Sequence, residues 1–327
     1  MTFTRYIKEI GRGAEGARAL AGPEAYALYG AMLDGGVPDL ELGAIVLALR
    51  VKGESLEEMQ GFLAAVSERS HFLRSPAGRP RPVVLPSYNG ARREANLTPL
   101  LALLLQRFGV PVIVHGLIEG YGRVTSGQIF RELGIFPCAS LTQAQSDLDE
   151  RNLAFVPLPI LSPGLNNLLA LRGRLGVRNS AHSLVKLLDP CRGEAVLIAA
   201  ATHPAFLDLM RELLLAGTGR ALLLRGTEGE PYANPKRRPR IEYLHEGVVD
   251  LLFDAEHESL KFLPHLPAAA DVVSTAHWIR QVVDQHLPLP LPIANQLACC
   301  LYVCGYAEDF NQAKAIVAVE GNGGLHS

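Results

Sequence analysis

A cluster of cations follows a glycine-containing turn near residue 230 and could bind phosphate groups. The stretch RGTEGEPYANPKRRPR, residues 225–240, ends in Lys236, Arg237, Arg238 and Arg240, with no acid among them. Prolines 235 and 239 hold this segment extended and spread its charges, which suits a phosphate backbone better than one compact phosphate. The alternatives at this point are a catalytic loop for a phosphorylated substrate, a nucleic-acid contact and a solvated turn.

A second group of cations lies between residues 165 and 192. If this segment is helical, residues 174, 178, 182 and 186 share one side, because they recur every four positions. Gly176 predicts a break near 176–179, which interrupts such a stripe. The nucleic-acid-binding candidates here are Arg172, Arg174, Arg178 and Lys186. Their alternatives are ordinary surface positions and, for Arg178, an internal ion pair.

The overall composition excludes a strongly basic protein. The chain has 327 residues, with 31 Lys and Arg against 33 Asp and Glu, and a net charge of -2. A polyanion would therefore have to bind a local cationic patch.

The five cysteines form no C-x-x-C pair, which favours buried thiols in a reducing compartment. There is no secretory signal and no apolar run of 18 residues, so we expect a soluble cytoplasmic protein without a membrane partner.

The elements that must position these cations differ between two regions. Residues 1–73 predict only helices, at 22–36, 39–53 and 55–70, the last with a capping box between Ser55 and Glu58. A Pro/Gly/Arg linker at 74–82 marks a boundary. We expect a small all-helical domain over residues 1–75, completed by a later helical segment at about 163–190.

The rest of the chain alternates between short apolar runs and helices. The expected strands are 82–86, 110–116, 153–159, 194–201 and 220–226. Strands separated by helices predict a mostly parallel central sheet covered on both faces. The fold class is therefore α/β, with the larger domain over 76–162 and 191–327.

Three segments resemble a known enzyme family. LGVRNSAHSLVKLLDP at 175–190 resembles the family segment L-G-I-R-T-x-F-N-L-L-G-P-L-x-N-P, and VHG at 114–116 resembles K-H-G. LLLRGTEGE at 222–230 stands where the family has V-V-H-G-x-D-G. The family is that of anthranilate phosphoribosyltransferase, or glycosyltransferase family 3, with the related nucleoside phosphorylases. The resemblance implies the phosphoribosyltransferase/nucleoside-phosphorylase type of fold.

The resemblance fails at the family's catalytic motifs. Its diphosphate turn, G-T-G-G-D, falls on Pro86–Gly90, which has one glycine and no aspartate. Proline lacks an N–H donor and tyrosine hinders close backbone approach. The family's acidic metal-binding pair falls on Pro231 and Tyr232, and neither can ligate Mg²⁺. We therefore predict no catalytic residue, no metal and no cofactor, with Mg²⁺ required only if the chain is an enzyme.

Some phosphate-binding capacity could survive. Thr98 and His115 match positions at the family's phosphate site, and cations stand near it. The possible phosphate-binding residues are Arg92, Arg93, Thr98, His115 and Arg123. In an active enzyme, Glu228 and Glu230 could hold a metal in a new register.

The segment RGTEGEPYANPKRR most resembles a catalytically degenerate, nucleic-acid-binding branch of the family. This resemblance implies a homodimer that binds DNA or RNA with little sequence preference, with single-stranded DNA favoured. It also implies dimer contacts through the N-terminal helices, where Ala44, Ile45, Leu47 and Ala48 either serve the dimer or pack internally. The alternatives are a glycosyl- or phosphoribosyltransferase with an altered substrate, and a cleft that binds a phosphate or nucleotide without chemistry.

Overall fold

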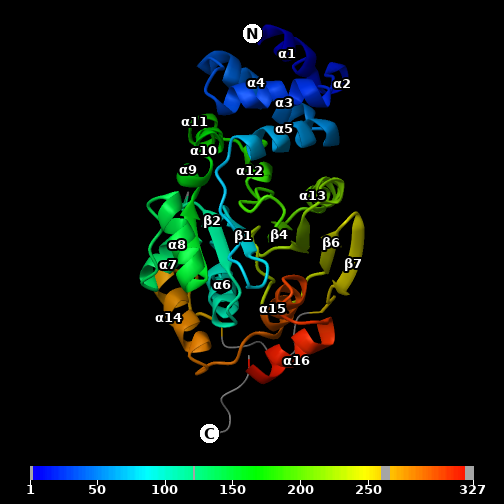
Figure 1. Ribbon diagram of the computed structural model, residues 1–327. Coiled ribbons are helices and arrows are strands. Elements are labelled where there is room, and N and C mark those ends of the chain that lie inside the picture. The colour runs from blue at the N-terminus through cyan, green and yellow to red at the C-terminus, as the bar shows by residue number, and fades with distance from the viewer. Residues whose placement is uncertain (1–2, 121, 259–265, 321–327) are drawn as a thin grey trace. The chain divides into compact units, whose positions relative to one another are not determined.

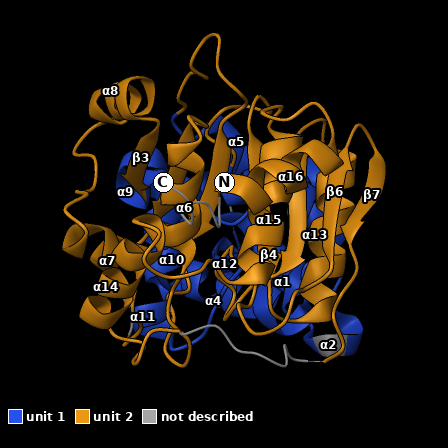
Figure 2. Cartoon of the chain, turned by 90° about the horizontal axis from the view of Figure 1, so that it is seen from below, with its two compact units in different colours: residues 1–71, 158–188 blue, residues 72–157, 189–327 orange. Residues whose placement is uncertain are grey.

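The computed structural model describes residues 3–120, 122–258 and 266–320 (Figure 1). The chain forms two compact units, shown in different colours in Figure 2. Unit 1 comprises residues 1–71 and 158–188, and unit 2 comprises residues 72–157 and 189–327. The chain passes between them slightly before the boundaries expected at 75, 162 and 190. The predicted combination of a helical domain and an α/β domain with a mostly parallel sheet is confirmed.

Unit 1 is all helical. Its helices are α1 (Thr4–Ile10), α2 (Gly13–Gly16), α3 (Gly22–Leu33), α4 (Asp39–Lys52), α5 (Leu56–Glu68), α9 (Leu158–Leu161), α10 (Pro163–Ala170), α11 (Arg172–Leu175) and α12 (Ala181–Leu184). Helix α3 packs on α5, where the rings of Tyr29 and Phe62 stack at 4.5 Å between centroids. The later helices complete the unit, because α10 contacts α3 and α12 contacts α5.

Helix α5 begins with the predicted capping box. The Ser55 hydroxyl accepts the Glu58 N–H at 3.2 Å, and the Glu58 carboxylate accepts the Ser55 N–H at 2.8 Å. The same fully buried carboxylate pairs with the Lys52 ammonium at 2.6 Å. The cap therefore satisfies a buried charge as well as the first helical N–H groups.

In the described part of unit 2, one sheet contains seven strands in the order β3-β2-β1-β4-β5-β6-β7. They are β1 (Val83–Ser87), β2 (Val112–Gly116), β3 (Leu153–Pro157), β4 (Val196–Ala201), β5 (Arg220–Arg225), β6 (Ile241–His245) and β7 (Val248–Phe253). Pairing is parallel from β3 to β5, and β6 and β7 add antiparallel strands. The five parallel strands are those that the apolar runs predict.

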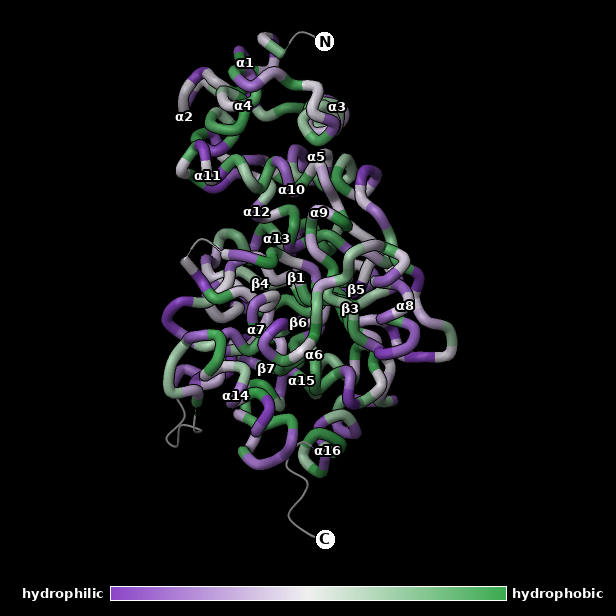
Figure 3. Tube along the Cα trace, turned by 90° about the vertical axis from the view of Figure 1, so that its left-hand side faces the viewer, coloured by the Kyte–Doolittle hydropathy of each residue, from purple (hydrophilic) through white to green (hydrophobic). Residues whose placement is uncertain are grey.

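The helices of unit 2 are α6 (Thr98–Arg107), α7 (Ser126–Glu132), α8 (Leu141–Arg151), α13 (Pro204–Ala216), α14 (Val272–Val283), α15 (Leu291–Val303) and α16 (Phe310–Glu320). The crossovers through α6 and α13 run away from the β1/β4 boundary in opposite directions. Right-handed crossovers then place α6 and α13 on opposite faces of the sheet. Helices α7, α14 and α15 share the α6 side, over alternate strand residues such as Val83, Leu85 and Ile198. Figure 3 traces the hydropathy of these elements.

The hairpin β6–β7 is absent from the sequence-based prediction. Its turn is formed by Glu246 and Gly247, with φ of 50° and 76°, the left-handed pair that suits a two-residue hairpin. Strand β6 directly follows the cation cluster, so the segment 225–240 connects two neighbouring strands, β5 and β6.

Each of the five cysteines is a buried free thiol, and their predicted burial is confirmed. No helix within the described ranges is both long and apolar enough to cross a membrane.

The two strands at the β1/β4 boundary mark the topological switch point of the parallel sheet. The chain leaves β1 toward β2 on one side and leaves β4 toward β5 on the other. In open α/β sheets, ligands bind outside the carboxyl ends of the strands at such a point. The loops after β1, β2 and β5 all lie at this edge, since these strands are parallel.

Candidate anion-binding site

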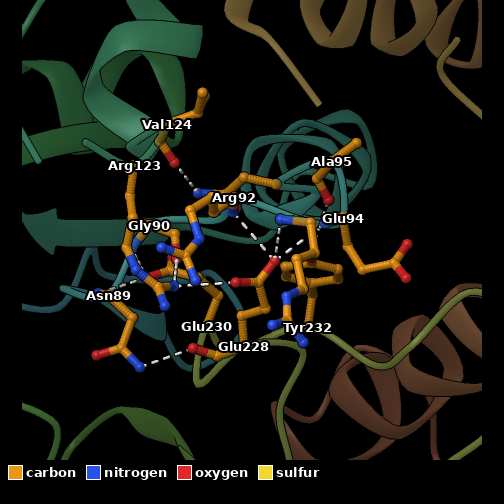
Figure 4. Close-up of polar contacts among 12 residues, drawn as sticks. Asn89, Gly90, Arg92, Glu94, Ala95, Arg123, Val124, Glu228, Glu230 and Tyr232 are labelled. Carbon is orange, nitrogen blue, oxygen red and sulfur yellow. Dashed lines mark hydrogen bonds and ion pairs between the residues drawn. The ribbon is translucent and has the colours of Figure 1, made fainter. Parts of the chain in front are cut away.

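Three loops meet at the carboxyl edge of the sheet in unit 2 (Figure 4). Ala91, after β1, and Val124, after β2, exchange two backbone hydrogen bonds of 2.9 and 2.8 Å. The loop after β5 joins them through Tyr232, which is fully buried and donates its hydroxyl to the Ala95 carbonyl at 2.7 Å. The site is therefore built by segments that are far apart in the sequence.

The carboxylate of Glu230 lies at the buried centre of this junction. One of its oxygens accepts the N–H groups of Asn89 at 2.7 Å and Gly90 at 2.8 Å. The other accepts the hydroxyl of Ser87 and, at 3.3 Å, that of Thr98. Its side chain is fully buried. The N–H groups and hydroxyls around the loop after β1 therefore all donate to a side chain from the loop after β5.

The carboxylate of Glu228 fills the outer part of the same loop (Figure 4). A single oxygen accepts three consecutive N–H groups, from Arg92 at 3.0 Å, Arg93 at 2.7 Å and Glu94 at 3.0 Å. The second oxygen lies 3.0 Å from the Arg123 guanidinium. Consecutive N–H groups that converge on one oxygen are a typical anion-binding arrangement.

These contacts stabilise the ionised form of Glu228. Burial alone would raise the pKa of its carboxyl group. The N–H groups of the 92–94 turn and the Arg123 charge outweigh burial, so the pKa lies below its ordinary value. The carboxylate is thus held as an anion by donors and by countercharge.

The backbone of both loops is shaped for this contact. Gly90 has φ of 61°, and a side chain there would meet Arg123 and Val124 atoms at 3.0 Å. Glu228 itself has φ of 51°, an uncommon conformation for a residue other than glycine. Gln296 holds the end of the β5 loop by accepting the Ala233 N–H at 2.6 Å and donating to the Pro231 carbonyl at 2.9 Å.

The sequence-predicted phosphate-binding residues lie near this site but are differently engaged. Thr98 is buried and donates to Glu230, and buried His115 has its Nδ1 2.6 Å from the Tyr88 hydroxyl. Arg123 pairs with Glu228. Arg92 and Arg93 contribute backbone N–H groups to Glu228, while the residues themselves are exposed. Apart from His115, these residues contact the chain's own carboxylates, Glu228 and Glu230.

The residues present do not fit the Mg²⁺-bound diphosphate that the fold family implies. Pro231 and Tyr232 offer no side-chain ligand for Mg²⁺, and the Tyr232 hydroxyl is committed to Ala95. The oxygens of Glu228 and Glu230 already accept hydrogen bonds from N–H groups, hydroxyls and the Arg123 guanidinium, so they are not free to coordinate a cation. This arrangement gives no support to the hypothesis that these glutamates hold a metal in a new register.

Carboxylates lie beside three of the four cations in the 236–240 cluster. Lys236 pairs with Glu94 at 2.9 Å, Arg238 with Glu256 at 3.5 Å, and Arg240 with Glu242 at 2.7 Å. Arg237 is exposed, and its side chain has no hydrogen-bond or ion-pair partner among the described residues. Residues 236–240 contain four cations and no acid, but the fold brings Glu94 and Glu256 to them from other segments, and Glu242 lies two residues beyond Arg240.

A cavity of about 570 Å³ opens beside this cluster. Its lining includes Arg225, Arg237, Arg238 and Arg240, with Glu94, Glu228 and Glu256. The sequence-based prediction missed Arg225, an exposed residue that also lacks a side-chain partner within the described residues. Its position at the carboxyl end of a predicted strand, next to the cation cluster, is the signal that could have found it.

The cations of unit 1 do not form the single stripe that a continuous helix would create. Helix α11 ends at Leu175, its C-cap Gly176 has φ of 73°, and α12 begins only at Ala181, so Arg178 lies in the intervening turn. Arg172 and Arg174 lie on α11, and Arg174 pairs with Asp39 at 3.0 Å. Lys186 is buried, so it adds little charge to the surface. The break near 176–179 is confirmed, and Lys186 is not retained as a contact.

Comparison with known proteins extends over nearly the whole chain. A family model described as "Glycosyl transferase family, helical bundle domain" matches residues 4–70. The uncharacterized protein YbiB of Escherichia coli is 44% identical over 318 residues, covering 97% of this chain and 99% of its own length. Anthranilate phosphoribosyltransferase of Persephonella marina is 27% identical over 226 residues, covering 68% of this chain and 65% of that enzyme.

Solved structures show the same fold. The anthranilate phosphoribosyltransferase of Thermus thermophilus superposes with a TM-score of 0.72 at 20% identity, covering 97% of this chain and 95% of that one. The Saccharomyces cerevisiae enzyme, in complex with PRPP and Mg, superposes with a TM-score of 0.72 at 15% identity, covering 98% and 94%. The chain belongs to the glycosyl transferase family 3, or anthranilate phosphoribosyltransferase-like, superfamily, and within it to the same family as YbiB.

Proposed function

We propose that this chain binds the phosphate backbone of nucleic acids, with little sequence preference, on a transferase scaffold that no longer uses the diphosphate chemistry of its superfamily. Single-stranded DNA is the favoured ligand, and RNA presents the same backbone charge. Non-specific binding of this kind needs several phosphate contacts and no base-reading element.

The observation that carries the proposal is the arginine-lined cavity of unit 2. Arg225 and Arg237 are exposed at its lining, and neither side chain pairs with a described carboxylate. Arg238 and Arg240 stand beside them with part of their charge compensated by Glu256 and Glu242. Two uncompensated guanidinium groups can each contact a backbone phosphate. We therefore expect modest affinity per chain and a clear salt dependence.

The same edge of the sheet argues against the transferase alternative. A diphosphate ligand would need the N–H groups of the loop after β1, but Glu228 and Glu230 already accept them. The residues at the family's metal positions cannot replace the lost ligands. This geometry favours a binding protein over an enzyme of the usual mechanism.

A homodimer is part of this proposal, through an apolar face of α4. Leu40, Leu47 and Val51 are 83%, 42% and 69% exposed, and their spacing places them on one side of the helix. Ile45 is fully buried and packs within unit 1, as the alternative for that residue holds. A dimer would present two copies of the arginine-lined cavity and raise the effective affinity. In sedimentation experiments we expect wild type to behave as a dimer and Leu40→Glu/Val51→Glu to behave as a monomer.

The test is fluorescence polarisation with labelled single-stranded DNA, duplex DNA and RNA of several sequences. Arg225→Ser/Arg237→Ser removes both unpaired arginines from the cavity lining and is called the groove variant. The matched control, Arg131→Ser/Arg151→Ser, removes two exposed arginines from the same unit outside the cavity lining. We expect the groove variant to weaken binding by about tenfold, since each lost phosphate contact removes a salt-dependent increment, and the control to change it less than twofold.

Two results would overturn the proposal. An equal loss of affinity in both double variants would show that the arginines of the cavity contribute no more to binding than other exposed arginines. Magnesium-dependent consumption of phosphoribosyl pyrophosphate with an acceptor, measured by pyrophosphate release, would establish the transferase alternative instead.

A further inference from the structure

We infer that the exposed ring of Phe206, together with that of His203, stacks on a base of a single-stranded nucleic acid whose phosphates lie at the arginine-lined cavity. This role rests on the proposed function and adds the contact that distinguishes a single strand from a duplex. The bases of a duplex are paired and stacked on one another, whereas a single strand can turn a base onto an aromatic ring.

The two rings form one exposed unit at the start of α13. Their centroids lie 6.3 Å apart with 77° between the ring planes, which is an edge-to-face contact. Both residues are exposed, and Phe206 keeps 40% of its surface open to solvent. His203 occupies the N-cap position of the helix, but within the described residues its side chain makes no capping hydrogen bond. The imidazole is therefore not used to begin the helix.

The first turn of α13 holds this pair in place. The His203 carbonyl accepts the N–H groups of Phe206 at 3.1 Å and Leu207 at 3.2 Å, and Pro204 fixes the backbone between them. Phe206 precedes the buried Met210 by four positions, so it lies at the end of the packing side of the helix. Because helical Cα–Cβ bonds tilt toward the N-terminus, the Phe206 ring leans toward the carboxyl edge of the sheet.

The rings lie close to the cavity. Ala201 at the end of β4 pairs with Arg225 at the end of β5, and the Gly226 N–H donates to the Ala201 carbonyl at 3.2 Å. Thr202 belongs to the cavity lining, and His203 follows it directly. Adjacent strands lie about 4.8 Å apart and two further residues add at most about 7 Å, so the His203 Cα lies within about 12 Å of the Arg225 Cα. Phosphates repeat about every 3.4 Å along one strand of B-DNA, so about four nucleotides or fewer span this distance.

The charges of the cavity alone do not distinguish single strands from duplexes, because both carry phosphates. Three acids also line the cavity, Glu94, Glu228 and Glu256, so the number of phosphates that it can accept is small. A contact that does not depend on charge would therefore carry a large share of the affinity. Every base has a π face, so stacking on Phe206 favours single strands without favouring a sequence.

The experiment measures fluorescence polarisation with three labelled probes of equal length: a single-stranded thymidine oligomer, an abasic oligomer with the same phosphates, and a duplex. Phe206→Leu removes the π face and keeps an apolar side chain, while Phe206→Tyr keeps the ring. The matched control is Phe136→Leu, at a phenylalanine that is 67% exposed between α7 and α8, outside the cavity lining. Urea unfolding checks that each variant is folded.

We expect Phe206→Leu to weaken binding of the thymidine oligomer about fivefold or more, and to change binding of the abasic oligomer and the duplex less than about twofold. Phe206→Tyr and Phe136→Leu should stay within about twofold of wild type on every probe. Wild type itself should bind the abasic oligomer about fivefold or more weakly than the thymidine oligomer, a comparison that needs no variant to fold.

Two outcomes would overturn this role of Phe206 while the proposed function stands. One is equal affinity of wild type for the thymidine and abasic oligomers. The other is a loss in Phe206→Leu that is absent or the same on all three probes, while the groove variant still weakens binding. Absence of binding of every probe by wild type would instead refute the proposed function, and the stacking contact with it.

Discussion

Replacing Glu230 tests whether its buried carboxylate stabilises the folded protein by accepting the N–H groups of the loop after β1. Glu230→Ala removes the acceptor of two N–H groups, from Asn89 and Gly90, in a fully buried position. The Ser87 hydroxyl keeps a partner, since it lies 2.7 Å from the Ser126 hydroxyl. Glu230→Gln retains one acceptor oxygen and places an amide beside hydroxyls that can accept from it. The two variants therefore separate loss of the acceptor from loss of the charge.

The expected magnitudes follow from these partners. A buried N–H without an acceptor costs about 1–3 kcal/mol, so Glu230→Ala should lower the free energy of unfolding by about 2–4 kcal/mol after partial access of water. Glu230→Gln should cost about 1 kcal/mol, because neutral hydrogen bonds are weaker than charge-assisted ones. The alanine variant should thus be less stable than the glutamine variant.

The assay is urea unfolding followed by the fluorescence of Trp278. This tryptophan is the only one in the sequence, and it is buried on α14 of unit 2, so the signal reports the unit that holds the site. If Glu230→Ala stays within about 0.5 kcal/mol of wild type, the range of ordinary surface substitutions, the reasoning is refuted.

The remaining predictions concern the same junction. Because the folded-state pKa of Glu228 is lowered, its contribution to stability is complete above the ordinary value of 4.5 and is lost as pH falls through the lower folded-state value. Urea unfolding of wild type and Glu228→Gln between pH 7 and pH 3 should show the difference between them shrink on the acid side, and a constant difference would contradict this. Gly90→Ala should destabilise unit 2 by about 1–3 kcal/mol, because alanine disfavours left-handed backbone and its Cβ would crowd Arg123 and Val124. The Trp278 signal measures that loss, and Gly247→Ala, at a hairpin turn with open space, should cost less.

Features with a local cause were predictable from the sequence. The apolar runs predicted at 82–86, 110–116 and 194–201 contain most of the parallel strands β1, β2 and β4, because short buried strands separated by helices have few other solutions. The capping box at Ser55 and Glu58 depends on residues three apart, so its pattern is visible in one dimension. The same holds for the break at Gly176.

Features with a long-range cause were not predictable. Glu228 reaches N–H groups more than 130 positions earlier, and a backbone N–H donor carries no residue-type signature. The pairing of Lys236 with Glu94 likewise depends on the folded loops. Strand β6 was missed because it directly follows the cation-rich, proline-containing loop. The sequence thus indicated departures from the family's catalytic motifs, but it did not indicate that Glu228 and Glu230 accept the N–H groups of the turn after β1.

The measurement that tests the central claim most directly is the salt dependence of binding to single-stranded DNA. Polarisation titrations of wild type and Arg225→Ser/Arg237→Ser between 50 and 200 mM salt give the slope of log affinity against log salt concentration. Each lost phosphate contact on a single strand lowers the slope by about 0.7, so the double variant should lose about 1.4 relative to wild type. The same slope in both proteins, or no binding by wild type at low salt, would contradict the account.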